Sequence, residues 1–202
     1  MRVLGLDEAG RGSVLGPLVV GGFLWEGEDQ APLRRAGADD SKVLSAARRR
    51  SVRVVLAGLG TGVVRMFEPA AIDDGNLNRL EEEAFLSLVA ELRPDRVYLD
   101  APVHPGGIPR LRARLIERSG VEDWIVECKA DATWPVVGAA SIFAKVARDG
   151  AIPDGVGSGY PSDPETRAWL SARLLESGPL PSCVRTRWGT LDVLRQQGLF
   201  RA

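Results

Sequence analysis

The 202-residue sequence has very few of the side chains that bind soft metals or form disulfide bonds. It contains one histidine, His104, and two cysteines, Cys128 and Cys183. A single histidine excludes a multi-histidine zinc site, and a Ser-His-Asp triad would have to use this one loop residue. Two cysteines do not indicate a disulfide framework, so reduced thiols are expected.

Long hydrophobic runs and an excess of charge of one sign are also missing. The apolar runs are short and broken by Gly and Pro, and no secretion signal opens the chain, so we expect a cytoplasmic protein without a membrane span. The net charge of the chain is -1. A protein that binds nucleic acid through the electrostatic field of its whole surface carries a positive net charge instead. Any nucleic-acid site must therefore be local. Basic residues do cluster, at Arg34, Arg35, Lys42, Arg48, Arg49, Arg50 and Arg53, at Arg110, Arg112 and Arg114, and at Arg185 and Arg187.

Hydrophobic residues make up 45% of the chain and charged residues 26%, which is typical of a folded globular protein. Apolar strand patterns come first, and strands then alternate with helical patterns, of which residues 76–92 are the longest. This order predicts an α/β fold with a mixed sheet, a core over residues 1–150 and a helical C-terminal extension over 151–202 that packs on the core within one domain. Pro69, Asp73, Asp74 and Gly75 are expected to break the chain, and Glu81, Glu82 and Glu83 to form the solvated side of the long helix.

Acidic residues recur where predicted strands end. Asp7 and Glu8 follow the first apolar run, Asp100 ends the strand pattern at 96–100, and Asp131 follows the pattern at 124–128. Neighbouring strands bring their ends together, and an all-oxygen ligand set suits Mg²⁺ or Mn²⁺. Each acid could instead be a simple turn residue. Successive strand residues point to opposite faces, so Asp7 and Glu8 can both face one metal only if the strand has ended or Glu8 uses its carbonyl.

The turn after Glu8 reads Gly10-Arg11-Gly12. Glycines here permit a positive φ and close approach of another backbone, and an arginine between them suits an anionic ligand. Lys42 either reaches a phosphate or is a solvated charge in the loop before a helix capped by Ser45. A carboxylate cage beside such a loop predicts phosphodiester hydrolysis, in which two ions about 3.5–4 Å apart activate water and stabilise the leaving oxygen.

Five segments, in order, resemble the ribonuclease HII family (type 2 ribonucleases H). They are DEAGRG, DDSK, VYLDAP, KADATWPVVGAASIFAKVARD and GSGYPSD. The segments GSGYPSDPETRAWL and NLNRLEEEAF resemble its archaeal branch in particular. The resemblance implies a ribonuclease H-like, mixed five-stranded sheet flanked by helices. It also implies endonucleolytic cleavage of the RNA strand of RNA/DNA hybrids, and cleavage 5′ to single ribonucleotides embedded in duplex DNA, giving 5′-phosphate and 3′-OH ends.

The same resemblance implies roles for individual residues. The matching catalytic, metal-binding acids, for Mg²⁺ or Mn²⁺, are Asp7, Glu8, Asp100 and Asp131. The elements that sense the ribose 2′-OH match Gly10, Arg11, Gly12 and Tyr160, where glycine backbone can approach the hydroxyl closely and an aromatic ring can stack on the next deoxyribose. Positions near the phosphate backbone match Lys42, Lys145 and Arg148. Asp149 could be a structural partner of Arg148.

Two other functions fit parts of the pattern. A nucleic-acid-binding module of the same fold without turnover is the main alternative, and a small-molecule phosphohydrolase would explain the acids but not Arg11, Lys42 and Tyr160. The expected partners are RNA/DNA hybrid and ribonucleotide-containing duplex DNA, bound by a monomer. Residues 196–200 (QQGLF) faintly resemble the start of a sliding-clamp binding motif, but the second aromatic is missing and a chance match is the better interpretation.

Overall fold

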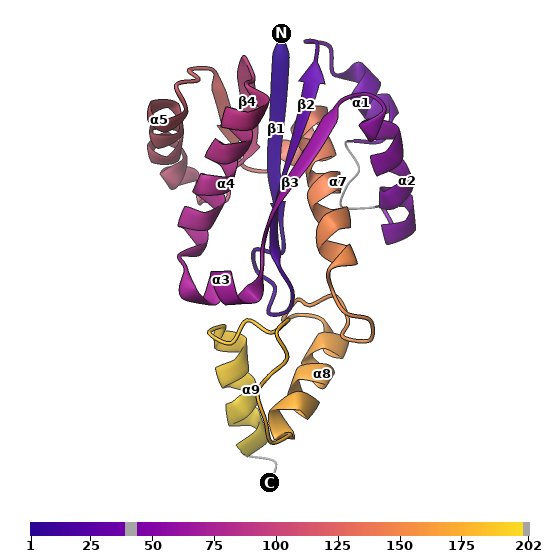
Figure 1. Ribbon diagram of the computed structural model, residues 1–202, viewed down its shortest axis with the longest axis vertical. Coiled ribbons are helices and arrows are strands. Elements are labelled where there is room, and N and C mark those ends of the chain that lie inside the picture. The colour runs from indigo at the N-terminus through magenta and orange to yellow at the C-terminus, as the bar shows by residue number, and fades with distance from the viewer. Residues whose placement is uncertain (39–43, 200–202) are drawn as a thin grey trace.

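A computed structural model describes residues 1–38 and 44–199, and the side chains of these up to residue 196. A five-stranded sheet with the order β3-β2-β1-β4-β5 forms its centre (Figure 1). Strand β2 is antiparallel to both of its neighbours, β1 and β3, whereas β4 runs parallel to β1 and β5 runs parallel to β4. The strands are β1 (Arg2–Ala9), β2 (Leu18–Glu26), β3 (Thr61–Phe67), β4 (Arg96–Asp100) and β5 (Trp124–Glu127).

Helices cover both faces of this sheet (Figure 1). On one face, α4 and α5 pack on Leu4 and Leu6 of β1. On the other face, α1, α2 and α7 pack on Val3 and Phe23. The helices of this part of the chain are α1 (Ala31–Arg35), α2 (Ala46–Ala57), α3 (Pro69–Asp74), α4 (Leu77–Leu92), the 3₁₀ turn η1 (Pro105–Gly107), α5 (Ile108–Ser119), α6 (Ala130–Thr133) and α7 (Pro135–Gly150).

Helix α7 lies closer to the sheet than side chains would allow. A Cβ atom added to Gly5 of β1 would come within 2.1 Å of the Val136 carbonyl oxygen, and one added to Gly21 of β2 within 2.3 Å of the Ala140 carbonyl oxygen. Backbone therefore packs directly on backbone, which only glycine permits. This contact fixes the height of α7 above the strand that carries Asp7.

The C-terminal extension lies beyond one end of the sheet, with α8 (Pro164–Leu175) beside α9 (Gly189–Leu199) (Figure 1). Its buried residues form a third apolar cluster, which includes Leu170 and Leu191. The β1–β2 loop contributes Val14 and Leu15 to that cluster. The N-terminal hairpin and the extension are thereby packed into one another.

The mixed sheet and its helical extension confirm the predicted fold class. The predicted break at residues 69–75 was wrong, because residues 69–74 form α3. Pro69 stands near its first position, where a missing N–H costs nothing. The division of the chain at residue 150 stays a prediction. Among the described residues, no helix is long and apolar enough to cross a membrane.

Candidate active site

Three carboxylates meet at the carboxyl end of the parallel strands. Leu6 of β1 is paired with Leu99 of β4, so the next residues in each strand, Asp7 and Asp100, lie side by side. Asp131 comes from α6, which follows the neighbouring strand β5. One oxygen from each of the three lies within 4.8 Å of the other two. The structure thus brings together three of the four acids expected from the sequence.

The alternation of the strand explains why these acids share a face. Val3 and Tyr98 pack under α7, and Asp7 and Asp100 follow them at even spacing in β1 and β4. Their side chains therefore point toward α7. Asp7 is only 4% exposed. The Asp100 carboxylate also accepts a hydrogen bond of 3.1 Å from the Ala130 amide, which ties α6 to the strand end.

Glu8 does not join this cluster through its side chain. Strand β1 remains paired with β2 as far as Ala9, so the strand has not ended at Glu8 and its side chain points to the opposite face from Asp7. Its Oε2 is buried and has no hydrogen-bond partner within residues 1–38 and 44–199. Burial, and the nearby charges of Asp7 and Asp100, raise the pKa of Glu8 to about 8. An unsatisfied buried carboxylate at this edge is a group that a cation would stabilise.

Helix α7 supplies a positive charge to the acids. Burial raises the pKa of Asp7 to about 6, and the charge of Lys145 and a hydrogen bond from Ser141 act in the opposite direction. Lys145 Nζ also donates to Ser141 Oγ one helical turn away. The predicted position of Lys145 near the substrate backbone is untested, and the structure places its charge close to Asp7. Ser141 was not singled out from the sequence, although its spacing of four residues from Lys145 puts both on one helix face.

The β1–β2 loop presents its glycines in two different ways. Gly10 has a φ of 85°, and a Cβ there would come within 2.5 Å of the Pro17 carbonyl oxygen. Gly12 is exposed, and a Cβ there would meet nothing within 4 Å. Gly10 is therefore required by the fold of the loop itself, whereas Gly12 leaves open space at the surface.

Arg11 is held by helix α4. Its guanidinium pairs with Glu81 and donates a 2.6 Å hydrogen bond to Asn78 Oδ1. Glu81 is 1% exposed, and Glu82 pairs with Arg114 and Arg118 of α5. The expectation of a solvated helix side was therefore wrong for Glu81 and Glu82, whereas Glu83 is exposed as expected.

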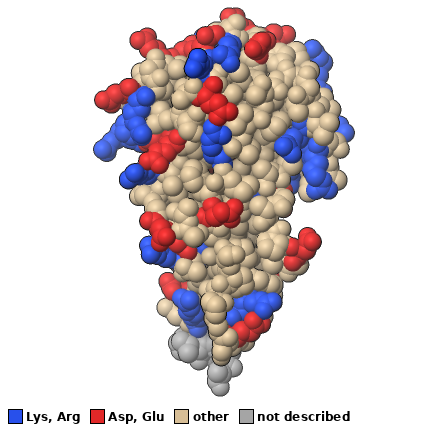
Figure 2. Space-filling model, in the orientation of Figure 1, with Lys and Arg blue, Asp and Glu red and all other residues tan. Residues whose placement is uncertain are grey.

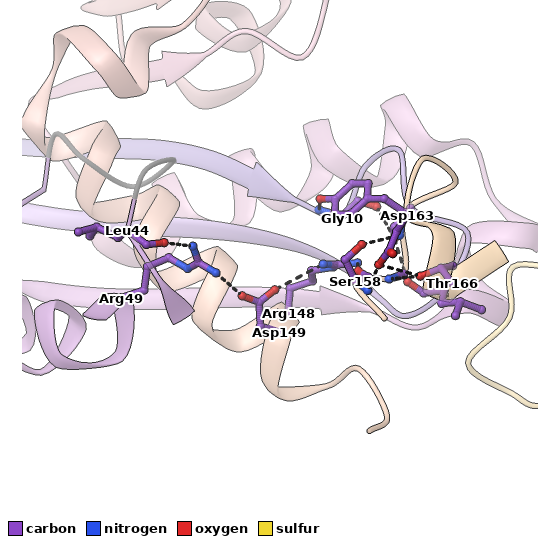
Figure 3. A network of polar contacts seen from close by, with 12 residues as sticks. Gly10, Leu44, Arg49, Arg148, Asp149, Ser158, Asp163 and Thr166 are labelled. Atoms are coloured by element: carbon purple, nitrogen blue, oxygen red, sulfur yellow. Dashed lines mark hydrogen bonds and ion pairs between the residues drawn. The ribbon is translucent and has the colours of Figure 1, made fainter. Parts of the chain in front are cut away.

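A second network holds Tyr160 against the loop. Its members Gly10, Arg148 and Ser158 are labelled in Figure 3. The Gly10 amide donates to the Tyr160 hydroxyl at 3.2 Å. The Arg148 guanidinium lies 4.5 Å from the centre of the Tyr160 ring and donates to the Ser158 carbonyl oxygen. Arg148 is only 3% exposed, so its side chain supports Tyr160 rather than lying open to a phosphate backbone as expected from the sequence.

Basic residues extend from this network along α2. Asp149 accepts from Arg49 at 2.8 Å and from Arg148 at 3.4 Å, so it is a structural partner of both arginines (Figure 3). Figure 2 shows basic side chains gathered on the edge of the molecule formed by α2. A hollow of about 540 Å³ between α2 and the end of α7 is lined by Arg49, Arg50 and Arg148. Lys42 lies outside the described residues.

The donor set fits a hard divalent cation. Asp7, Asp100 and Asp131 offer only carboxylate oxygens, which suit Mg²⁺ or Mn²⁺, and neither imidazole nor thiolate takes part in the cluster. Burial opposes the charges of Asp7 and Glu8 in the protein alone. A bound cation would remove this cost.

Comparisons with known proteins point in one direction. A profile described as Ribonuclease HII matches residues 4–191. The chain is 39% identical to Ribonuclease HII of Archaeoglobus fulgidus over 96% of this chain and 97% of that protein. It is similar to the solved structure of the PCNA:RNase HII complex from the same organism, with a TM-score of 0.88, 38% identity and coverage of 99% of this chain and 100% of that chain. The crystal structure of ribonuclease H2 from Pyrococcus horikoshii OT3 matches with a TM-score of 0.87 and 36% identity over 98% of this chain and 99% of that chain.

Proposed function

This chain belongs to the ribonuclease HII family, and from that membership we propose that it cuts 5′ to single ribonucleotides embedded in duplex DNA as well as within RNA/DNA hybrids. The family is one of metal-dependent endoribonucleases of the ribonuclease H type. The observation that carries the finer proposal is that Asp7 of the acidic cluster lies near the end of β1, directly before the Gly10–Gly12 loop, whose Gly10 amide donates to the Tyr160 hydroxyl. Chemistry and ribose recognition are thereby adjacent in one site.

The reaction proposed is hydrolysis of a phosphodiester to 5′-phosphate and 3′-OH ends. Asp7, Asp100 and Asp131 would hold Mg²⁺ or Mn²⁺, and Glu8, whose side chain points to the opposite face of the strand from Asp7, would add its carbonyl oxygen. When bound, a pair of such ions activates a water molecule and stabilises the leaving oxygen. The Lys145 ammonium beside Asp7 would offset part of the negative charge that the substrate phosphate must approach.

Recognition of the ribose falls to the loop and to Tyr160. The open space above Gly12 lets the substrate backbone approach the loop amides, which can meet the 2′-OH that distinguishes RNA from DNA. The Tyr160 ring, held by Arg148, offers a flat surface to the neighbouring sugar. We propose that Arg11 and the arginines of α2 contact phosphates, and that the enzyme acts as a monomer.

Cleavage of end-labelled duplexes tests this function. The substrates are DNA duplex with one ribonucleotide, a continuous RNA/DNA hybrid and all-DNA duplex, each with Mg²⁺, Mn²⁺ or EDTA. We expect metal-dependent nicks 5′ to the ribonucleotide and in the hybrid, lost in Asp7→Asn and Asp100→Asn and retained in the exposed control Asp192→Asn. Binding without cleavage in either metal would favour the non-catalytic binding module instead.

A sliding clamp is a second proposed partner. The similar protein from Archaeoglobus fulgidus was solved in a PCNA:RNase HII complex, and residues 196–200 of this chain begin like a clamp-binding motif. Calorimetric titration with a PCNA-type clamp should show binding that Phe200→Ala abolishes and Arg201→Ala preserves, with cleavage of free duplex unchanged in both. Equal affinity of the two variants would contradict a role for this motif.

A further inference from the structure

Arg185, in the segment between α8 and α9, has no exposed surface. Its guanidinium donates three hydrogen bonds, all to backbone carbonyl oxygens of the β1–β2 loop. Nη2 donates to Gly10 at 2.6 Å, Nη1 to Arg11 at 3.2 Å and Nε to Gly16 at 3.0 Å. One side chain of the extension thus binds both ends of the loop that carries the glycines.

Packing alone does not explain an arginine at this position. Burial of a charged group is costly unless it is compensated, and no carboxylate in the described part of the chain pairs with Arg185. Burial lowers its pKa to about 10, with the charge of Arg148 acting in the same direction. The compensation comes from the three carbonyls and from the Trp188 ring, whose centre lies 5.0 Å from the guanidinium. The planar guanidinium holds its N–H donors in a fixed geometry, and in this geometry they reach the three carbonyl oxygens of the loop at once.

The loop is also bound to the turn that carries Tyr160. The Gly159 carbonyl oxygen accepts from the Val14 amide at 2.9 Å and from the Leu15 amide at 3.1 Å. On the other side, the Arg185 amide donates to the Val14 carbonyl oxygen at 3.0 Å. The loop therefore lies between the Tyr160 turn and the Arg185 segment, and a shift of either one changes the distance between Gly10 and Tyr160.

We propose that Arg185 is a positioning residue for substrate recognition, which sets the Gly10–Gly12 loop at the correct distance from Tyr160. This inference rests on the proposed function, since it assigns Arg185 to the recognition half of that site. Arg185 does not touch the three acids. Its loss should therefore weaken substrate binding and ribonucleotide selectivity more than it slows the chemical step.

The test compares Arg185→Lys with Arg187→Lys. Both substitutions keep the charge and remove the planar guanidinium, but Arg187 is exposed and contacts Asp73 and Asp74 at the C-terminal end of α3 instead of the loop. With the embedded-ribonucleotide duplex, we expect Arg185→Lys to lower kcat/KM by about tenfold or more, mainly through KM, because a misplaced recognition loop loses charged hydrogen bonds. Arg187→Lys should stay within about twofold of wild type.

Two further measurements separate positioning from packing. In EDTA, fluorescence anisotropy should show that Arg185→Lys loses the preference for ribonucleotide-containing duplex over all-DNA duplex. Hydrogen exchange should show faster exchange of the loop amides, with the sheet unchanged. A third variant, Arg185→Met, fills the space without any donor and should be the least active; if it matches or exceeds Arg185→Lys, Arg185 only packs and the proposal is wrong.

The outcomes also separate this inference from the function on which it rests. If the wild-type protein fails to cut both the hybrid and the embedded ribonucleotide, the proposed function fails. If wild type cuts and Arg185→Lys has the same KM, selectivity and loop exchange as wild type, the positioning role alone is overturned.

Discussion

Replacement of Asp7 by asparagine should abolish activity and yet stabilise the metal-free protein at neutral pH. Asp7 is almost fully buried, and burial raises its pKa from 3.8 to about 6 even though Lys145 and Ser141 favour its charged form. The folded protein therefore resists ionisation of this group more than the unfolded chain does. An amide of the same shape has no charge to bury.

The sign of the pH dependence follows from this order of pKa values. The unfolded chain loses the proton near pH 4 and the folded protein near pH 6, so stability is highest below pH 4, falls as the pH rises to about 6 and is then constant. A tenfold difference in proton affinity is 1.36 kcal/mol. A rise of the pKa of Asp7 from 3.8 to about 6 therefore lowers the free energy of unfolding above pH 6 by about 3 kcal/mol at most. For a chain of this length, about 3 kcal/mol corresponds to a shift in Tm of roughly 6–12 °C. Asparagine also forgoes the attraction of Lys145, which makes these figures upper limits.

Thermal unfolding in a chelating buffer provides the assay, at pH 4.5, 6 and 8, for wild type, Asp7→Asn and the exposed control Asp192→Asn. The Tm advantage of Asp7→Asn over wild type should be smallest at pH 4.5 and largest at pH 8, while Asp192→Asn follows wild type. Added Mg²⁺ or Mn²⁺ should raise the Tm of wild type, more at pH 8 than at pH 4.5. If Asp7→Asn is less stable than wild type at pH 8 without metal, the buried charge is not the dominant cost.

Four further predictions concern the proposed recognition half of the site. Gly12→Ala should change the free energy of unfolding by less than about 0.5 kcal/mol but lower kcat/KM by about tenfold, because its methyl group enters open space that we propose the substrate occupies. Gly10→Ala should instead lower the free energy of unfolding by about 1–3 kcal/mol in chemical denaturation, owing to its positive φ. Glu81→Gln removes the charge that holds Arg11, so KM should rise with little change in kcat, and an unchanged KM would show that the pair is only structural. Tyr160→Phe keeps the ring and loses the hydroxyl that accepts from the Gly10 amide. The single-turnover cleavage rate should therefore fall less in Tyr160→Phe than in Tyr160→Ala. Equal losses of rate in the two variants would contradict a role for the ring.

Local patterns were sufficient to predict the acidic cluster. Asp7, Asp100 and Asp131 each follow an apolar strand pattern, and the ends of adjacent parallel strands must meet. Alternation also predicted that Glu8 and Asp7 would point to opposite faces, as the continued pairing of β1 confirms. The mixed sheet was also predictable, because apolar strand patterns come first along the chain and strand patterns then alternate with helical patterns.

Contacts between distant segments were not predictable in this way. Glu81 stands among three consecutive glutamates on an amphipathic helix, and its burial and its pair with Arg11 of the β1–β2 loop appear only in the folded structure. Asn78 and Glu81 do lie on one helix face, a spacing that could have suggested a shared cationic partner. Arg185 had even less signal, because in the sequence it is one more basic residue, and its acceptors are backbone carbonyls about 170 positions away.

The small apolar cluster of the extension has a consequence for the way the enzyme fails on heating. Val14 and Leu15 belong to that cluster, which is separate from the two clusters on either face of the sheet. Regions with few buried contacts open locally at a lower free energy than the main core. Opening of the extension would release the Gly10–Gly12 loop and Tyr160 together while the sheet and its acids stay folded. With ribose recognition assigned to this loop and Tyr160 as proposed, heat inactivation should begin as a loss of ribonucleotide selectivity in molecules whose far-UV circular dichroism is still close to native.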